Sequence, residues 1–335
     1  MRKVSVALGA ILIALVIGLG AVPLVVNLLN QKPLGIADKT ENVNVMLTRP
    51  ANWRKIANEP VISQDDMDII DGSTATIPIT AELLRQFFDL RDGDINSHRV
   101  VYHSTTHEAY LKLINSEDRF GYGRNTSLIF VTPPSDEELN YAAQQGVELD
   151  ITPIAKDGFV FITHKDNPVD SLTVEQIQDI YTGKITNWKE VGGKDLEIKA
   201  YQREKNSGSQ TAMEQMVMQG KSMISPITAN VYMGMGALIE AVAEYENGPA
   251  SIGYTYNYYI NNLYKNENIK VIKINGVSPT NENLISGAYA FSTSYYAVIR
   301  KNEPQESPAR KLRDYLLTKE GQEIIAMAGY CKAVN

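Results

Sequence analysis

Three short stretches of the sequence gather serine and threonine, two of them together with glycine, where an extended pattern gives way to a helical one. They span residues 71–78, 102–108 and 201–211, and the last also contains Arg203. The N-terminus of a helix presents unpaired backbone N–H groups and a partial positive charge, and hydroxyl side chains add further donors. If these three corners meet in the fold, we expect them to form a cage for a small tetrahedral oxyanion.

Arg203 would add a fixed charge to such a cage, because its planar guanidinium can bind two oxygens of one ligand. Ser207 and Gln210 have the spacing of a capping box, and so do Thr105 and Glu108. Serine and threonine at a helix start usually serve only as caps, and a single arginine more often forms a surface ion pair. The binding hypothesis therefore depends on three similar corners and not on any one of them.

Alternating strand and helix patterns would position the corners. Extended runs at 68–70, 99–102 and 128–131 precede helical patterns at 81–90, 108–114 and 137–145. A second set has strands at 159–163 and 197–201 and helices at 174–181 and 211–219, and the chain ends with strands at 269–274 and 295–299 and helices at 307–317 and 320–327. This rhythm predicts an α/β protein with two doubly wound lobes, whose ligand lies beyond the carboxyl ends of the strands.

The N-terminal segment is expected to meet a membrane. A short positive flank precedes a nearly uninterrupted apolar run from Val4 to Leu29, which is long enough to cross a bilayer. The flank orients the N-terminus inside and the rest of the chain outside. A small-residue pattern at 35–37 keeps a cleaved signal open, whereas the length of the run favours a retained anchor. We expect residues 1–30 to be this anchor or signal segment and residues 31–65 to be a linker.

Composition limits the function classes. The chain has 335 residues, of which 44% are hydrophobic and 21% charged, so it is long enough for two compact lobes. Its formal net charge of −7 argues against a nucleic-acid-binding surface, which draws on clustered lysine and arginine. Cys331 is the only cysteine, so no intrachain disulfide can form.

Several motifs together resemble the PstS-like family, the phosphate-binding subunits of bacterial phosphate ABC transporters. The resemblance covers most of the chain after about residue 62. It is carried by Asp71-Gly72-Ser73-Thr74-Ala75-Thr76-Ile77-Pro78, by Ile180-Tyr181-Thr182-Gly183-Lys184-Ile185-Thr186-Asn187-Trp188, by Arg203 with Asn206-Ser207-Gly208-Ser209, and by Ile252-Gly253-Tyr254. The second of these motifs is the most specific to such proteins.

The resemblance implies a periplasmic-binding-protein type II fold with a two-crossing hinge. One lobe would comprise residues 66–157 plus 254–335, and the other residues 158–253. Phosphate would bind in the cleft between them, and the closed form would be recognised by ABC permease subunits. By motif match, the phosphate-binding residues would be Ser73, Thr74, Thr76, Ser104, Thr105, Thr132, Arg203, Ser207, Gly208 and Ser209. A monomer at the extracytoplasmic face of the cell membrane, with no enzymatic activity, no cofactor and no metal, is expected.

One departure from the family concerns selectivity. The family commonly places an aspartate after the third strand, where its carboxylate accepts the proton of hydrogenphosphate. Here the nearest equivalent is Thr132, with Asp136 and Asp157 as the other acidic candidates. Discrimination between phosphate and sulfate is therefore an open question, because it depends on a repulsive acceptor as well as on donors.

Two other functions remain open at the level of sequence. The fold could serve as a membrane-anchored sensor or receptor ectodomain for a different oxyanion or small ligand. His103 and His107 stand four positions apart, as metal ligands on one helix face do, which would suit a metal-dependent hydrolase. The same two histidines could instead assist anion capture at mildly acidic pH if they become charged at the edge of the cleft.

Overall fold

The computed structural model describes residues 47–225, 231–232, 235–243 and 248–334. All of them belong to one compact unit, Asp38–Asn335, and the N-terminal apolar run lies outside the described residues. No helix in the described part of the chain is both long and apolar enough to span a bilayer. The fold is a mixed α/β fold, as the alternating patterns predicted.

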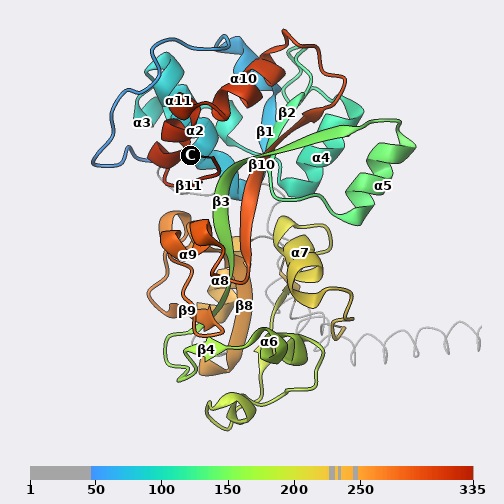
Figure 1. Ribbon diagram of the computed structural model, residues 1–335, viewed down its shortest axis with the longest axis vertical. Coiled ribbons are helices and arrows are strands. Elements are labelled where there is room, and N and C mark those ends of the chain that lie inside the picture. The colour runs from blue at the N-terminus through green and yellow to red at the C-terminus, as the bar shows by residue number, and fades with distance from the viewer. Residues whose placement is uncertain (1–46, 226–230, 233–234, 244–247, 335) are drawn as a thin grey trace, which may run out of the picture. The chain divides into compact units, whose positions relative to one another are not determined.

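Two strands tie the unit together. β3 (Leu149–His164) pairs antiparallel with β10 (Ser292–Arg300) along its first half, and with β8 (Ser251–Tyr256) and β9 (Ile269–Ile274) along its second half. The change of partner falls at Gly158 and Phe159. In Figure 1, β3 and β10 run side by side between the elements around β1 and β2 and those around β8 and β9. We call the elements on the first half of β3 lobe 1 and those on its second half lobe 2.

Lobe 1 carries the first two corners. β1 (Ile70–Gly72) is parallel to β2 (Leu128–Val131), and β10 joins β2 to β3. The helices of this lobe are α2 (Ile77–Phe88), α3 (Asp92–Ser97), α4 (Thr106–Asn115), α5 (Asp136–Gln144), α10 (Pro308–Leu316) and α11 (Lys319–Met327). Short 3-10 helices lie at η1 (Asp65–Ile69), η2 (Thr74–Thr76) and η3 (Arg99–Val101), and β11 (Cys331–Lys332) pairs with β3.

Lobe 2 carries the third corner. β5 (Lys199–Ala200) is parallel to β8, β4 (Ser171–Leu172) is parallel to β9, and β6 (Gln202–Arg203) forms a separate pair with β7 (Val231–Tyr232). The helices are α6 (Val174–Tyr181), α7 (Gly208–Ala212), α8 (Met235–Ala243) and α9 (Asn281–Ser286). Two π-helices, η5 (Met213–Met218) and η8 (Tyr259–Leu263), and the 3-10 helices η4 (Trp188–Val191) and η7 (Gly248–Ala250) complete it.

The lobe boundaries differ from those expected. β9 pairs with Phe161 to His164 of β3 and with β4, so residues 254–274 lie on the sheet of lobe 2 and not of lobe 1. The chain returns to lobe 1 only through β10. The pattern of single strands could not reveal this, because β3 reads as two separate segments interrupted by Pro153 and the polar pair Lys156 and Asp157.

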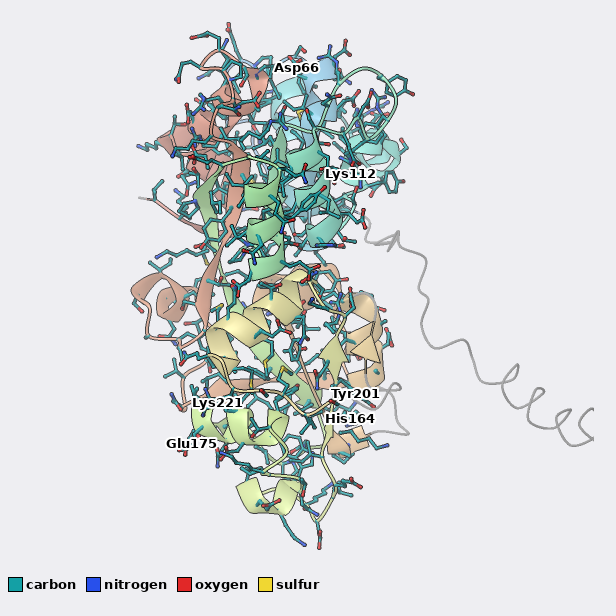
Figure 2. All side chains as sticks on the ribbon, turned by 90° about the vertical axis from the view of Figure 1, so that its right-hand side faces the viewer. Asp66, Lys112, His164, Glu175, Tyr201 and Lys221 are labelled. Atoms are coloured by element: carbon teal, nitrogen blue, oxygen red, sulfur yellow. The ribbon has the colours of Figure 1, made fainter. Side chains whose placement is uncertain are left out.

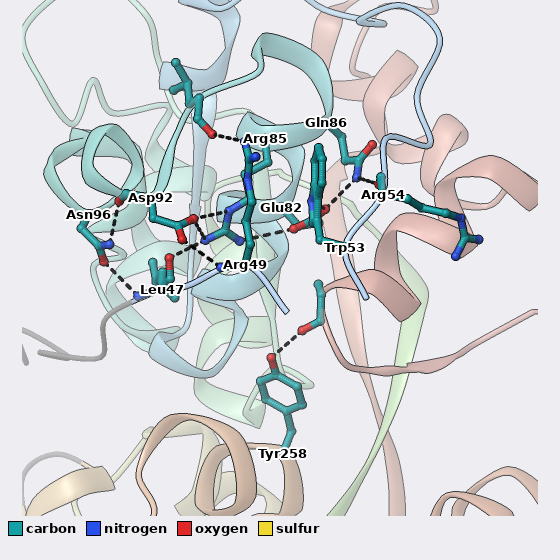
Figure 3. A network of polar contacts seen from close by, with 12 residues as sticks. Leu47, Arg49, Trp53, Arg54, Glu82, Arg85, Gln86, Asp92, Asn96 and Tyr258 are labelled. Carbon is teal, nitrogen blue, oxygen red and sulfur yellow. Dashed lines mark hydrogen bonds and ion pairs between the residues drawn. The ribbon is translucent and has the colours of Figure 1, made fainter. Parts of the chain in front are cut away.

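Part of the expected linker is docked on lobe 1. The side chain of Gln86 on α2 accepts hydrogen bonds from the backbone N–H groups of Ile56 and Ala57 and donates to Arg54 O. Trp53 Nε1 donates to Glu82 Oε1 at 2.8 Å, and Figure 3 shows this network. Burial raises the pKa of Glu82, although its bonds from Gln86 and Trp53 oppose the shift. Residues 47–57 are therefore held against α2.

Candidate functional site

The first corner follows β1 and enters α2 through η2. Thr76 is fully buried, and its hydroxyl donates to Phe130 O of β2 at 2.6 Å. The Ser73 hydroxyl lies 3.3 Å from Thr76 Oγ1, and Thr74 is also buried. The proton of the Thr76 hydroxyl is thus already used to fasten η2 to β2, so Thr76 positions this corner more than it offers a free hydroxyl donor.

His103 fastens the second corner to the first. Its Nδ1 lies 2.9 Å from Ser73 O, which can only accept, so we assign the ring proton to Nδ1. Its Nε2 is then the acceptor for Thr80 Oγ1 at 3.0 Å. Burial lowers the pKa of His103 to about 4. The hypothesis that a charged His103 assists anion capture is therefore wrong, because the imidazole is neutral at physiological pH and both ring nitrogens are occupied.

A buried ion pair joins the same two corners. Asp71 Oδ1 accepts from the backbone N–H groups of Gly72 and Ser104, each at 2.8 Å. Its Oδ2 lies 3.2 Å from Arg119 Nε, and Arg119 donates through its other nitrogens to Ile70 O and Tyr102 O. Asp71 and Arg119 are both almost fully buried. They fix Ser104 beside the end of β1, and no motif in the sequence pointed to this role of Arg119.

Thr105 and Thr106 begin α4 in an unexpected way. Thr105 has a φ of 102°, and its side chain makes no capping hydrogen bond. The predicted capping box between Thr105 and Glu108 is therefore wrong, since the Thr105 hydroxyl accepts no hydrogen bond from the first turn of α4. Thr105 N instead donates to Gly72 O at 3.2 Å, which holds the second corner on β1.

The third corner contains Arg203 and the start of α7. Ser207 Oγ accepts from Gln210 N at 3.2 Å, so Ser207 is the N-cap that its spacing predicted. Arg203 is buried, and its Nε and Nη2 donate to the carboxylate of Glu204 at 3.0 and 2.9 Å. Arg203 Nη1 faces Ser209 Oγ at 3.5 Å. Glu204 thus fixes one edge of the guanidinium and turns another toward α7.

Gly208 brings the third corner against lobe 1. A methyl group built on Gly208 would lie 2.3 Å from Thr132 Oγ1 and 2.8 Å from Thr106 Oγ1. Tyr256 OH donates to Gly208 O at 3.0 Å, which fixes the backbone at this point. Only glycine allows lobe 2 to approach these two hydroxyls so closely. Gly208 and Thr132 were among the residues predicted from the sequence, whereas Thr106 was not.

The buried hydroxyl of Thr132 lacks a hydrogen-bond partner among the described residues. The nearby Tyr256 hydroxyl contacts it without completing such a bond. The backbone of Thr132 is held by Tyr110 OH, which donates to Thr132 O at 2.9 Å. A buried polar group without a partner costs free energy, so its presence points to a partner that arrives with a ligand.

These contacts bring Thr132, Thr106 and Gly208 into one place, with Ser209 and Arg203 next to Gly208 on lobe 2. Ser73, Thr76 and Ser104 lie at the carboxyl end of β1, and Thr132 lies at the carboxyl end of β2. Because β1 and β2 are parallel neighbours, these ends share one edge of the sheet. The hydroxyl groups of Thr106 and Thr132 thus lie against Gly208 at the start of α7, where Ser209 faces Arg203 Nη1.

The chain matches a family model described as PBP superfamily domain over residues 70–320. It is 31% identical to the phosphate-binding protein PstS of Staphylococcus saprophyticus over 253 residues, which cover 73% of each chain. The chain belongs to the PstS-like family of substrate-binding proteins. This PstS-like chain is also 23% identical to the phosphate-binding protein PstS of Borreliella burgdorferi, over 83% of its own length and 92% of that protein.

Solved structures agree with the fold. A phosphate-bound ABC transporter substrate-binding protein from Clostridium perfringens has 28% identity and a TM-score of 0.57, over 79% of the PstS-like chain and 98% of that protein. An ABC-type phosphate transport receptor from Vibrio cholerae has 23% identity and a TM-score of 0.55, over 78% and 98% of the two chains. The predicted α/β fold class and the family resemblance are thus confirmed.

The two histidines of the hydrolase alternative do not point to a common ligand in the PstS-like chain. His103 bonds within lobe 1 as described, whereas His107 Nδ1 lies 2.9 Å from Glu138 Oε1. This hydrogen bond raises the pKa of His107. Within the described residues, no three side chains of histidine, cysteine, aspartate or glutamate gather as a metal site.

Proposed function

We propose that this chain binds inorganic phosphate between its two lobes and delivers it to ABC permease subunits for import. The observation that carries the proposal is the approach of Gly208 to Thr132 and Thr106, around a buried hydroxyl that completes no hydrogen bond with the described residues. The names of its relatives supply the ligand class. Phosphate contacts would come from Ser73, Thr74, Thr76, Ser104, Thr105, Thr132, Arg203, Ser207, Gly208 and Ser209, to which we add Thr106.

Local geometry explains how an acidic protein would hold an anion. The carboxylates within the corners are paired with cations: Asp71 and Glu204 each with an arginine, and Glu108 with Lys112. The remaining groups are donors that act over hydrogen-bond distances, so the formal net charge of −7 has little influence inside the site. Binding would make and break no covalent bond, and lobe closure would be the signal that the permease reads.

The same geometry affects how well the site can distinguish phosphate from sulfate. Thr132 is neutral. The carboxylate of Asp157 already accepts hydrogen bonds from Gly158 N, Tyr258 N and Tyr295 OH. Asp136 starts α5 at the rim of the groove between α5 and α7. None of these carboxylates replaces the missing acceptor, so we expect sulfate to compete with phosphate more strongly than in a site that contains one.

Calorimetric titration of the full chain in lipid nanodiscs with phosphate, sulfate and molybdate tests the proposal. Phosphate should bind with a single site per chain, and sulfate should displace it. Absence of phosphate binding would reject the proposed function. Binding of phosphate with no competition from sulfate would retain the function and reject the inferred loss of selectivity.

Replacing Arg203 with lysine should weaken phosphate binding about tenfold. Lysine keeps the charge but loses the planar fork that bonds Glu204 while facing Ser209, and such a loss is worth roughly 1–2 kcal/mol. Arg310→Lys is a matched control, because Arg310 bonds only to backbone carbonyls of Lys301 and Glu303 in the hydrogen bonds of the described structure. Equal affinities of the two variants would remove Arg203 from the site.

The location would follow from the same function. We propose that the protein acts as a monomer at the extracytoplasmic face of the cell membrane, with residues 1–30 as anchor or cleaved signal. The docked segment 47–57 supports a tether that leads to lobe 1, since its contacts are with α2 and α3. Under this proposal lobe 2 is the part that moves during closure.

A further inference from the structure

An ion pair spans the two lobes on the side away from β3. Lys205 Nζ of lobe 2 lies 2.5 Å from Glu137 Oε2 on α5 of lobe 1. Lys205, and next to it Asn206, hold the pKa of Glu137 below its usual value. Every other ion pair between described residues joins two groups of the same lobe. Gln215 Nε2 adds a hydrogen bond to Pro134 O at 3.3 Å, also between lobes.

These contacts cross an open groove. The groove has a volume of about 1330 Å³ and is lined by α4 and α5 on one side and by α7, η5 and the loop at Lys205 and Asn206 on the other. Figure 2 is turned toward this side of the molecule, with Lys112 marking α4 and Lys221 marking the chain just after η5. The ion pair therefore closes part of the mouth between the lobes.

The ion pair is directly connected to the anion site. Lys205 lies two residues after Arg203 and two before Ser207, so it belongs to the loop of the third corner. On lobe 1, Glu137 precedes Glu138, whose carboxylate bonds His107 at 2.9 Å, one residue after Thr106. Both sides of the pair are thus carried by the loops and helix starts that hold the ligand contacts.

We propose that Glu137 and Lys205 form a latch that holds the lobes closed over the bound anion and sets its release rate. The proposal rests on the proposed function. Because the partners lie on different lobes, opening breaks the pair, so its free energy favours only the closed form. Dissociation requires opening, whereas capture begins from the open form, so the latch slows release and leaves capture almost unchanged.

The solvent exposure of Glu137 and Lys205 determines how strongly their pair can slow release. The two side chains are 76% and 53% exposed, so the pair is solvated and screened by salt. Breaking such a pair should speed release about two- to fivefold. Raising the ionic strength from about 0.02 M to about 0.5 M should remove most of that difference.

Exchange of radiolabelled phosphate from the full chain in nanodiscs tests the latch. Glu137→Gln and Lys205→Met should each speed release about two- to fivefold at low salt. The exchanged pair, Glu137→Lys with Lys205→Glu, should restore slow release. Glu148→Gln is the matched control, since Glu148 and Lys301 form an exposed pair at 2.7 Å within lobe 1. Equal release from Glu137→Gln and Glu148→Gln, or fast release from the exchanged pair, would overturn the proposal.

A second measurement separates the latch from the ligand assignment. Spin labels at Leu139 on α5 and at Glu175 on α6, in a Cys331→Ser background, report the separation of the lobes without any ligand. Glu137→Gln should populate larger separations than Glu148→Gln at low salt. If the wild type binds no phosphate but this difference is present, the proposed function fails and the latch stands. If the separations are equal, the latch is rejected whatever the ligand.

Discussion

Replacing Gly208 with alanine should lower phosphate affinity about a hundredfold while both lobes remain folded. The new methyl group would lie 2.3 Å from Thr132 Oγ1, closer than real Cβ atoms approach, and 3.3 Å from Thr132 Cβ, which is a tight contact. Overpacking at such a contact costs up to about 3 kcal/mol, and each 1.4 kcal/mol is a factor of about ten in affinity. Since Gly208 and Thr132 belong to different lobes, the molecule relieves the contact by opening and so loses the closed complex.

Gly93 provides the control for this substitution. It lies in α3 of lobe 1, and a methyl group there would meet no other atom within 4 Å. Gly93→Ala should therefore bind phosphate as the wild type does. Calorimetric titration gives the affinities, and thermal unfolding shows whether each variant is folded. A folded Gly208→Ala variant with unchanged affinity would contradict the close approach of the lobes at this residue.

Local patterns in the sequence were sufficient where local forces decide the structure. The apolar run Leu128–Val131 is β2, and Val174–Tyr181 is α6, which Thr173 and Gln176 cap as a capping box. The apolar pair Val100 and Val101 predicted a strand, but this segment is η3 and packs against α2. Both residues are buried in either conformation, so their hydrophobicity could not distinguish the two.

Long-range contacts decided what the sequence could not predict. β3 extends from Leu149 because it pairs with β10, and the register of that pair shifts at Tyr295 and Tyr296, opposite Pro153. The first and third corners were recognisable as strand-to-helix junctions, whereas the second follows η3 and not the predicted strand. The internal bonds of the corners were not recognisable, because the hydroxyl of Thr76 is directed to Phe130 of a distant strand and Arg203 is oriented by Glu204. Residue types indicate donors, but only the packed strands determine which donors remain for a ligand.

The contribution of Asp157 to the stability of the protein should fall as pH rises toward 7. This carboxyl is buried where β3 changes partners, and burial raises its pKa to about 7, although its bonds from Gly158 N, Tyr295 OH and Tyr258 N oppose the shift. The unfolded chain releases this proton near the ordinary aspartate pKa of 3.8, whereas the folded protein keeps it until about pH 7. The favourable contribution of Asp157 to the free energy of unfolding is therefore complete below pH 3.8 and is lost by about pH 7, at roughly 1.4 kcal/mol per pH unit.

Asp157→Asn should remove this dependence of the free energy of unfolding on pH, because the asparagine side chain does not ionise. The free energy of unfolding in urea, measured at about pH 4.5 and about pH 7.5, should fall by roughly 3–4 kcal/mol more in the wild type than in the variant. Asp170→Asn is the control, since Asp170 is exposed beside Lys270 and its pKa is lowered. The carboxyl links β3 to Tyr295 of β10 and to Tyr258, so its ionisation acts on both strands that connect the lobes. Parallel pH profiles for the wild type and Asp157→Asn would show that the carboxyl is already ionised in the folded hinge.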